Sequence, residues 1–416
     1  MYYLKASRLM AALLAMLLTV SLLVSGCGSD KEAKKSGEAQ NKTPDELVLG
    51  YAASMTGKFS TEGTDVKRAY DLWAEQVNAK GGIEVKEAGK KMKVKLIYYD
   101  DTSDASTAVK MYEKLITGDK VDLLLSPWGS GNNFAVTAMT EKYEKPVLVS
   151  AGSSDSIFTR GLKYVFQTSP LGSKHAEAMI GYLKGKKDEV KTVAIAYENF
   201  LFTQTMFDAL KPALEAEGFK VVIAEQYPMG GKDFAGLLTK VKSANPDAFI
   251  LLNIMPASVY VTRQMNELKI KPKFYLAAIG PMFTKEFIEG LGDSSEGVVE
   301  LGFWHQDLPY PTAKQFEKDF TGKFGKEPST DAAWAYIACQ VLQQAIERTG
   351  STDGKKLAQA MHGGSFDTIL GTYKYDDKGV NQNQVVFLTQ VQNKKRLIVW
   401  PDNIAQAKLR FPVFSK

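Results

Sequence analysis

The segment Val121–Asn133, with the sequence VDLLLSPWGSGNN, joins an apolar stretch to a glycine-rich loop and the start of a helix. Its first five residues are almost wholly apolar, as expected of a strand that is buried on both faces of a sheet. Pro127 ends that stretch, and a helical pattern begins at Phe134. This order of elements predicts that Ser130 lies at the carboxyl edge of a parallel sheet. Open α/β sheets bind ligands at that edge, and a helix N-terminus favours an anionic group.

A second segment of the same kind follows directly. Pro146–Val149 predicts another buried strand, and it ends in Ser150–Asp155, with the sequence SAGSSD. Serine hydroxyls are short hydrogen-bond donors, and glycine lets the backbone approach a ligand closely. Either loop alone is better explained as an ordinary Gly/Ser loop. Because two such loops are expected at neighbouring strand ends, we predict a small-molecule site there.

Strand and helix patterns alternate along most of the 416-residue chain, which is too long for one ordinary core and favours two domains. Alternation of this kind is typical of doubly wound, Rossmann-like α/β sheets. The first run has expected strands at Leu47–Ser54, Lys93–Asp101, Val121–Leu125 and Pro146–Val149, with helices at Thr61–Ala79 and near 105–115 and 134–143. The second run has expected strands at Thr192–Tyr197, Lys220–Gln226, Ala248–Ile254 and Phe274–Ile279, with helices at His175–Leu183, Gln204–Ala216, Phe234–Val241 and Ala257–Leu268. Beyond them we expect a strand at Gly297–Trp304, helices near Ala313–Phe324 and Trp334–Arg348, and short strands at Gly371–Tyr375, Val385–Val391 and Leu397–Trp400.

Residues 1–26 have the pattern of a signal peptide, with a basic start and an apolar run at Leu9–Val24. A membrane-spanning anchor is the alternative, but the run is short for one. Val24–Cys27 resembles the bacterial lipobox, in which the cysteine is diacylated, so Cys27 is the expected lipidation site. Residues 27–46 then form a lipidated, flexible tether, since they are rich in Ser, Lys and Glu and lack an apolar period. These features predict a protein held by lipid at the outer face of the cell membrane or in the periplasm.

Charge and cysteine content exclude several classes of protein. The composition, with 44% hydrophobic and 24% charged residues, excludes a mostly disordered chain. The formal net charge is +5, and removing the signal peptide with Lys5 and Arg8 leaves 50 basic against 47 acidic residues. No basic block stands out, so nucleic acid is not an expected partner. With Cys27 acylated, Cys339 has no disulfide partner and is expected to be a small core residue.

Enzyme signatures are missing from the sequence. The three histidines have no catalytic spacing, and there is no Walker loop, H-E-x-x-H or C-x-x-C motif. Trp128 stands where a G-x-S-x-G nucleophile elbow needs glycine, and Phe134 where a dinucleotide fingerprint needs its third glycine. Asp100 and Asp101 are adjacent carboxylates, but we expect them to cap the following helix. A binding module without cofactor or metal is therefore favoured over an exported hydrolase.

Several motifs together resemble the type I periplasmic binding proteins, in the leucine/isoleucine/valine-binding branch of ABC transporter receptors. They are SMTG (Ser54–Gly57), EQVNAKGGI (Glu75–Ile83), YYDDTSD (Tyr98–Asp104), the SPWGSG and SAGSSD loops, and GTYKYDDKG (Gly371–Gly379). The resemblance implies two lobes joined by a three-stranded hinge that close on a ligand. Mapped onto this chain, lobe one is 47–170 plus 301–370, and lobe two is 171–300 plus 371–416. It also implies a monomer that delivers a small molecule to a membrane permease. A sensory ligand-binding protein is the alternative, disfavoured because the sequence has no second membrane segment or cytoplasmic module.

The resemblance implies that the two loops hold the ligand's carboxylate. Ser130 matches a hydroxyl position of the first loop. In the second loop, Gly152 matches a residue whose carbonyl accepts from the ligand, and Ser154 matches a hydroxyl-bearing residue. These three residues are candidate ligand-binding positions.

Three further candidates have an equally ordinary structural explanation. Trp128 forms an apolar wall of the site or packs under its loop. Phe202 falls where the family often places an aromatic ring from lobe two, but it also fits a core position. Glu62 lies at a mouth position where relatives often carry an aromatic, and it is equally an exposed acid in the first turn of a helix.

The position of Ala278 bears on the ligand's charge. Amino-acid receptors of this branch usually place a lobe-two carboxylate opposite the ligand's ammonium, and Ala278 falls about where that acid belongs. A buried ammonium without a partner is unfavourable. Either Glu62 supplies the charge, or the ligand is an aromatic or branched carboxylate or amide without a cationic group. The sequence favours the second alternative, with Trp128, Phe202, Ile254 and Ala278 as candidate walls.

Overall fold

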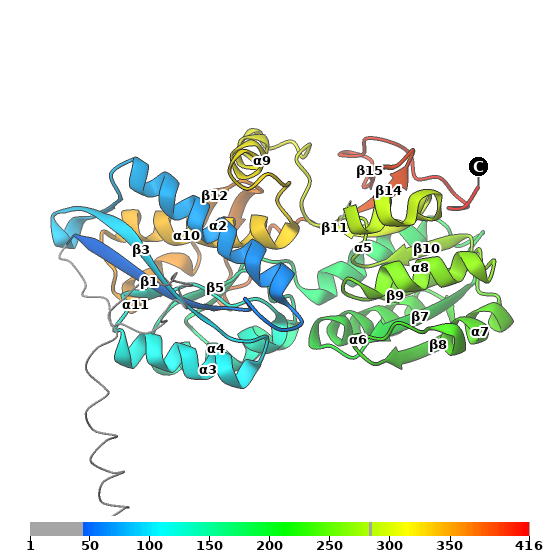
Figure 1. The fold of residues 1–416 in the computed structure, drawn as a ribbon, viewed down its shortest axis with the longest axis horizontal. Coiled ribbons are helices and arrows are strands. Elements are labelled where there is room, and N and C mark those ends of the chain that lie inside the picture. The colour runs from blue at the N-terminus through cyan, green and yellow to red at the C-terminus, as the bar shows by residue number, and fades with distance from the viewer. Residues whose placement is uncertain (1–44, 283–284, 416) are drawn as a thin grey trace, which may run out of the picture. The chain divides into compact units, whose positions relative to one another are not determined.

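A computed structural model describes residues 45–282 and 285–415 (Figure 1). The predicted signal peptide, Cys27 and nearly all of the predicted tether lie outside these residues. The first part of the described chain contains β1 (Glu46–Ala53), α2 (Ser60–Ala79), β2 (Ile83–Val85), β3 (Lys90–Asp100), α3 (Ala105–Glu113), β4 (Leu123–Leu124), α4 (Ser130–Lys142), β5 (Val147–Val149) and β6 (Val165–Gln167). The second contains α5 (Gly172–Lys184), β7 (Thr192–Glu198), α6 (Leu201–Ala216), β8 (Lys220–Tyr227), α7 (Ala235–Ala244), β9 (Ala248–Leu252), α8 (Ala257–Glu267), β10 (Phe274–Ala277) and β11 (Val299–Gly302). The third contains α9 (Pro311–Phe324), α10 (Thr330–Thr349), α11 (Gly354–Met361), β12 (Ser365–Thr368), β13 (Gly371–Lys374), β14 (Phe387–Gln392) and β15 (Lys395–Trp400).

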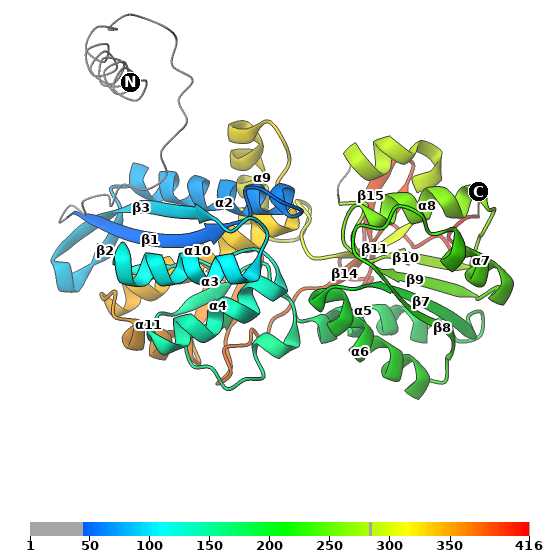
Figure 2. The same cartoon turned by 60° about the horizontal axis from the view of Figure 1, so that its bottom comes forward.

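The first sheet has the strand order β2-β3-β1-β4. Its central strand β1 pairs in parallel with both β3 and β4, while β2 pairs antiparallel with β3. Alternate residues of β1 face opposite cores, because successive side chains of a strand point to opposite faces. Leu47 and Leu49 join the core that includes α2 and α10, whereas Val48 and Ala52 join the core under α3 and α4. Figure 2 shows these two helix pairs on opposite faces of the sheet.

The loops after β4 and β5 lie side by side, as the sequence predicts. Trp128 and Ala151 form a parallel bridge, in which the Gly129 N–H donates to the Ala151 carbonyl over 2.8 Å. The expected strand Val121–Leu125 is shorter than predicted, because only Leu123–Leu124 belong to the ladder. Lys120 on one side has a positive φ of 53°, and Pro127 on the other lacks a backbone N–H.

The second sheet has the order β15-β14-β11-β10-β9-β7-β8. Strands β8, β7, β9, β10 and β11 run parallel, and β14 and β15 are antiparallel additions at one edge. All five residues of β9 are buried, as expected of a central strand covered on both faces. Helices α5 and α6 lie on one face of this sheet and α7 and α8 on the other (Figure 2).

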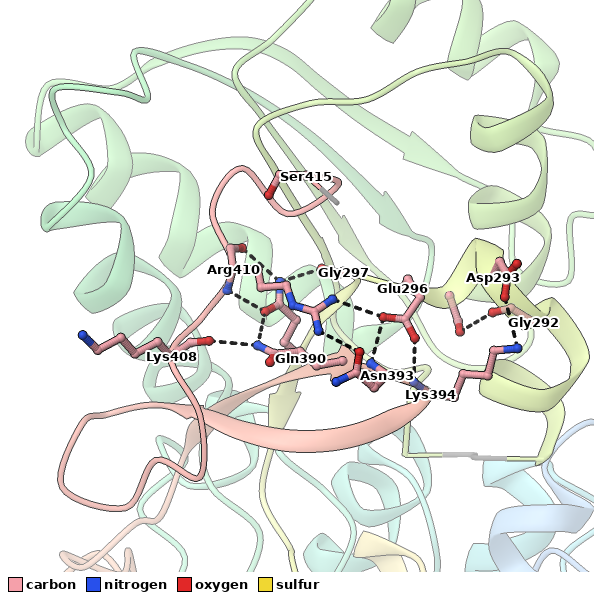
Figure 3. Close-up of polar contacts among 12 residues, drawn as sticks. Gly292, Asp293, Glu296, Gly297, Gln390, Asn393, Lys394, Lys408, Arg410 and Ser415 are labelled. Carbon is pink, nitrogen blue, oxygen red and sulfur yellow. Dashed lines mark hydrogen bonds and ion pairs between the residues drawn. The ribbon is translucent and has the colours of Figure 1, made fainter.

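The segment after β15 passes β14 and is held there by the buried amide of Gln390 (Figure 3). Gln390 Nε2 donates to the carbonyls of Gly297 and Arg410, at 3.0 and 3.1 Å. Its Oε1 accepts from the Arg410 N–H at 2.8 Å. The Arg410 guanidinium also contacts Asn393 and Glu296, so this return segment is fixed by polar contacts at several points.

The prediction that Asp100 and Asp101 cap the next helix is wrong. Asp104 caps α3, because its carboxylate accepts from the Thr107 N–H at 2.8 Å. Asp100 instead accepts from the Met55 N–H at 3.0 Å, and Asp101 from the Ser54 hydroxyl at 2.7 Å. Both acids therefore fix the loop between β1 and α2.

Two parallel-stranded α/β sheets are confirmed, and most predicted elements lie where expected. Cys339 is a buried free thiol in α10, as predicted. None of the helices in the described ranges has both the length and the apolar composition that a membrane crossing needs. The assignment of residue ranges to lobes stays a prediction.

Candidate functional site

A cavity of about 60 Å³ lies where loops and helices of both sheets meet. One group of wall residues comes from the segments after β4 and β5 and from the N-terminal parts of α2 and α10: Glu62, Trp128, Gly129, Ser130, Ala151, Ser153, Thr330, Asp331 and Trp334. The other group follows strands of the second sheet: Phe200, Phe202, Ile254, Met255, Ile279, Met282 and Phe303. For comparison, an engineered apolar cavity of about 150 Å³ in another protein holds benzene. This cavity is partly open to solvent, so a solute of that size can extend out of it.

The loop before α4 presents its backbone and Ser130 to the cavity. Gly129 has a φ of 91°, a conformation that residues with a side chain rarely adopt. The Asn133 amide fixes the loop by donating to the carbonyls of Pro127 and Gly129, at 2.9 and 3.0 Å. Ser130 begins α4 and is nearly fully buried, and its Oγ accepts from the Ser154 N–H at 3.3 Å. The first N–H groups of a helix have no intrahelical partner, so this end suits an anionic group.

Aromatic rings make up much of the wall. The rings of Trp128 and Phe200 are nearly parallel, with an interplanar angle of 11° and 6.1 Å between centroids. The ring centroids of Phe303 and Trp334 lie 5.4 Å apart, and the two rings are tilted relative to each other. Phe202 completes the set of five rings. Such rings bind apolar or aromatic groups, and their faces also attract cations.

Two carboxylates meet at this cavity. Glu62 lies in the first turn of α2, and Asp331 in the first turn of α10, and both are half-buried. Burial raises the pKa of Glu62 to about 7, an effect that its own backbone N–H opposes. Burial and the negative charge of Glu62 raise the pKa of Asp331 to about 8, against the opposing effect of the Trp128 indole. The pair therefore holds protons near neutral pH that ordinary carboxyl groups lose.

Two buried donors that α10 contributes to the wall make no hydrogen bond within the part of the chain that the structure describes. They are the indole N–H of Trp334 and the hydroxyl of Thr330, on residues only 6% and 4% exposed. The Trp128 indole lies close enough to Asp331 to lower its pKa but makes no hydrogen bond of normal geometry. Buried donors are normally paired, so these groups point to an acceptor on a bound molecule.

The cavity brings together four of the six residues predicted to bind ligand: Glu62, Trp128, Ser130 and Phe202. Gly152 and Ser154 do not line it. The Gly152 N–H donates to Ser169 at 3.2 Å, and the Ser154 hydroxyl contacts Ser156 and Thr205. Of the other predicted walls, Ile254 lines the cavity, whereas Ala278, the residue after β10, is fully buried and does not line it.

The sequence interpretation missed Asp331, Thr330 and Trp334 of α10. Ser329 is the N-cap of this helix, and its side chain accepts from the Ala332 N–H. An acid next to such a cap is common in helices without a ligand, so the local sequence gives no distinct signal. The signal lies in the long-range packing of α10 beside α2, where the Trp73 indole donates to Gln343 at 3.1 Å.

No cluster of three or more His, Cys, Asp or Glu side chains suited to a metal ion occurs in residues 45–282 and 285–415. The groups that line the cavity are its five rings, its two carboxylates and its hydroxyl and N–H donors.

The chain is similar to known proteins over most of its length. A family model described as periplasmic binding protein matches residues 46–396. Leu/Ile/Val-binding protein homolog 7 of Brucella suis biovar 1 (strain 1330) is 23% identical over 383 residues, which cover 88% of this chain and 94% of that protein.

Solved structures share the fold. A leucine-binding protein from Thermotoga maritima MSB8 has a TM-score of 0.73 and 23% identity, over 85% of this chain and 97% of that chain. A solute-binding protein of an ABC transporter from R. palustris, solved in complex with benzoate, has a TM-score of 0.74 and 19% identity, over 88% and 100% of the two chains. The predicted type I periplasmic binding protein fold is thus confirmed. Because the family match covers most of the sequence, the chain belongs to the periplasmic binding proteins, a family of solute-binding proteins.

Proposed function

We propose that this protein is a lipid-anchored, extracytoplasmic receptor of an ABC importer. It binds a small amino-acid-like, aromatic or branched carboxylate or amide and delivers it to a permease in the membrane. It works as a monomer and without a cofactor.

The observation that carries this proposal is the cavity between the ends of the two sets of strands. Much of its wall comes from segments that follow the carboxyl ends of parallel strands, where open α/β sheets bind ligands. Residues from both sheets line it, so a ligand there bridges both. The cavity is also partly open to solvent, which leaves a route for a solute to enter.

The start of α4 is the proposed site for the solute's carboxylate. Ser130 and the neighbouring N–H groups at this helix start are donors of the kind that bind anions. Ser154 is proposed as a second hydroxyl donor, with the Gly152 carbonyl as an acceptor. Both belong to the loop that pairs with Trp128–Gly129, although neither lines the cavity in this structure.

The relatives support a small organic solute but differ in what they bind. The Brucella protein is named for leucine, isoleucine and valine, whereas the R. palustris structure holds benzoate. The five rings of the cavity suit either a branched or an aromatic group. The proposed anchor depends on Cys27 and its lipobox-like context.

A thermal-shift screen of the mature protein tests the proposal. A ligand that binds only the folded state raises the melting temperature in proportion to the logarithm of its concentration over Kd. The screen covers amino acids, aromatic acids, branched acids, amides and alkyl amines. Stabilisation by at least one class, confirmed by calorimetry with one site per chain, is the expected result. A folded protein that no class stabilises would contradict the proposed function.

A further inference from the structure

The two carboxylates of the cavity lack the partners that the fully or almost fully buried acids of the described residues have. Asp101 and Glu198 accept hydrogen bonds from hydroxyl and N–H donors, whereas Asp65 and Glu300 pair with cations. Asp65, one turn after Glu62, is almost fully buried and pairs with Lys326 at 2.8 Å and Arg68 at 3.0 Å. Glu300 is fully buried and pairs with Arg396 at 2.9 Å. The chain thus supplies a cation to these buried carboxylates, as is usual in proteins.

Glu62 and Asp331 have no such cation. Among the residues that the structure describes, no lysine or arginine forms an ion pair with either carboxylate. Both lie in the first turn of a helix, where the backbone favours negative charge, and both face the same cavity. Two like charges at one partly buried site repel, and a cation between them removes that repulsion.

The surroundings of the pair suit an organic cation better than a metal ion. Five aromatic rings line the same small cavity, and their faces attract a positively charged nitrogen. A metal ion prefers several oxygen or nitrogen ligands, which apolar rings do not offer.

The unpartnered donors give an independent indication of a ligand. The Trp334 N–H and the Thr330 hydroxyl adjoin Asp331 on α10, are more than nine-tenths buried and lack an acceptor within the described ranges. A bound molecule with an oxygen acceptor near its cationic group satisfies them. The cavity therefore offers negative charge and rings for a cation, and buried donors for an adjacent oxygen.

We propose that the solute carries an organic ammonium group, which lies between Glu62 and Asp331 against the rings of Trp128 and Trp334. This inference rests on the proposed solute-binding function and narrows its ligand class. It also replaces the preference from the sequence for a solute without a cationic group. The negative charge that faces the ammonium group is supplied by acids of α2 and α10, and not by an acid at the strand end at Ala278.

Matched pairs of compounds test the charge alone. Choline is compared with dimethylbutanol, its uncharged carbon isostere, and glycine betaine with dimethylbutanoate. Leucine and phenylalanine are compared with their 2-oxo acids, so that primary and quaternary ammonium groups are both covered. In at least one pair, calorimetry is expected to show that the ammonium compound binds at least about tenfold more tightly than its partner without the ammonium group.

Single substitutions then assign the preference to the two acids. Glu62→Gln and Asp331→Asn are each expected to weaken binding of the ammonium compound about 10- to 150-fold. The affinity for its isostere without the ammonium group should not change. Glu327→Gln is the matched control, because Glu327 is exposed and lies just before α10. This substitution removes one negative charge outside the cavity. The control variant is expected to bind both members like the parent protein.

Proton release gives a measurement that needs no variant. A cation favours the ionised form of both carboxylates, so its binding near pH 7 should release protons from the pair. Calorimetry in phosphate and in MOPS buffer, which differ in ionisation enthalpy and contain no small primary or quaternary ammonium ion, measures that release. Choline itself does not titrate, so released protons come from the protein.

The outcomes separate this inference from the proposed function. If acids or amides bind but every ammonium member binds no better than its isostere, the inference is wrong and the receptor function stands. The same conclusion follows if Glu62→Gln and Asp331→Asn behave like Glu327→Gln. If no compound of any class binds the folded protein, the proposed function fails, and the inference fails with it.

Discussion

The hydroxyl oxygens of Ser154 and Thr205 lie 2.7 Å apart, linking the loop after β5 to helix α6. Thr205 Oγ1 is also 2.9 Å from the Leu201 carbonyl, which can only accept a hydrogen bond. The Thr205 proton therefore goes to Leu201, and Ser154 donates its single proton to Thr205. Ser154 can hold a ligand carboxylate only by releasing Thr205.

This competition gives opposite predictions for the two hydroxyl groups. Ser154→Ala, like Ser130→Ala, should weaken binding of a carboxylate-bearing ligand about 10- to 150-fold, since a hydrogen bond to a charged group contributes roughly 1.5–3 kcal/mol. Thr205→Val should strengthen binding about two- to tenfold, because it removes the competing acceptor, which is worth roughly 0.5–1.5 kcal/mol. Calorimetry measures both. If Ser154→Ala lowers the melting temperature but leaves the affinity unchanged, Ser154 is a structural residue.

Asp331 should make the ligand-free protein less stable as pH rises. Its ordinary pKa is 3.8, and burial together with the Glu62 charge raises it to about 8 in the folded state. Between these values the folded protein keeps a proton that the unfolded chain loses, so this group's stabilising contribution declines as pH rises through that window. Asp331→Asn cannot titrate and should melt a few degrees higher than the parent protein above about pH 8, with little or no gain below about pH 4. A melting difference that stays constant with pH would show that this carboxyl titrates normally.

The proposed anchor predicts how Cys27→Ser behaves in cells. Two or more acyl chains hold a protein stably at a membrane, whereas one chain holds it only marginally. The variant should therefore appear in the soluble fraction or as uncleaved precursor, whereas the parent protein partitions into detergent with the membrane fraction. Fractionation followed by mass spectrometry of the N-terminus distinguishes the forms. A variant that is processed and partitions like the parent protein would show that Cys27 is not the lipidation site.

The parts of the site that the sequence predicts are those encoded by local patterns. Trp128 and Ser130 follow an apolar strand and a proline, so their place at the sheet edge follows from chain order alone. The adjacency of the second loop is also predicted from chain order, although β4 and β5 belong to separate sheets and only the isolated bridge between Trp128 and Ala151 joins them.

Asp331 shows what local patterns do not encode. It is 269 positions from Glu62 along the chain, and the two meet only because α10 packs beside α2. The same reason explains the error at Asp100 and Asp101, whose carboxylates bind backbone and hydroxyl groups of the β1–α2 loop 44 to 47 positions earlier. Helix capping is a local rule, and it fails where long-range partners are better placed.

The fully buried ring of His175 predicts a loss of stability in acid. It lies 4.5 Å from the ring of Phe303 and 5.4 Å from that of Phe202, two wall residues of the cavity. Burial lowers the pKa of His175 to about 3, from an ordinary value of 6.5, against the opposing effect of the Pro170 carbonyl.

Between these two values the unfolded chain binds a proton that the folded protein does not. The stability that His175 contributes is therefore fully present above about pH 6.5 and is lost as pH falls towards 3. His175→Phe removes this group and keeps an aromatic ring in the core. Urea denaturation at neutral pH and at about pH 4 gives the unfolding free energy that each protein loses in acid. We expect this loss to be roughly 3 kcal/mol smaller in the variant than in the parent protein. Burial also lowers the pKa of His305, to about 4, so the variant should still lose some unfolding free energy in acid. Parallel loss of stability in the two proteins would show that His175 is not the group whose protonation drives acid unfolding.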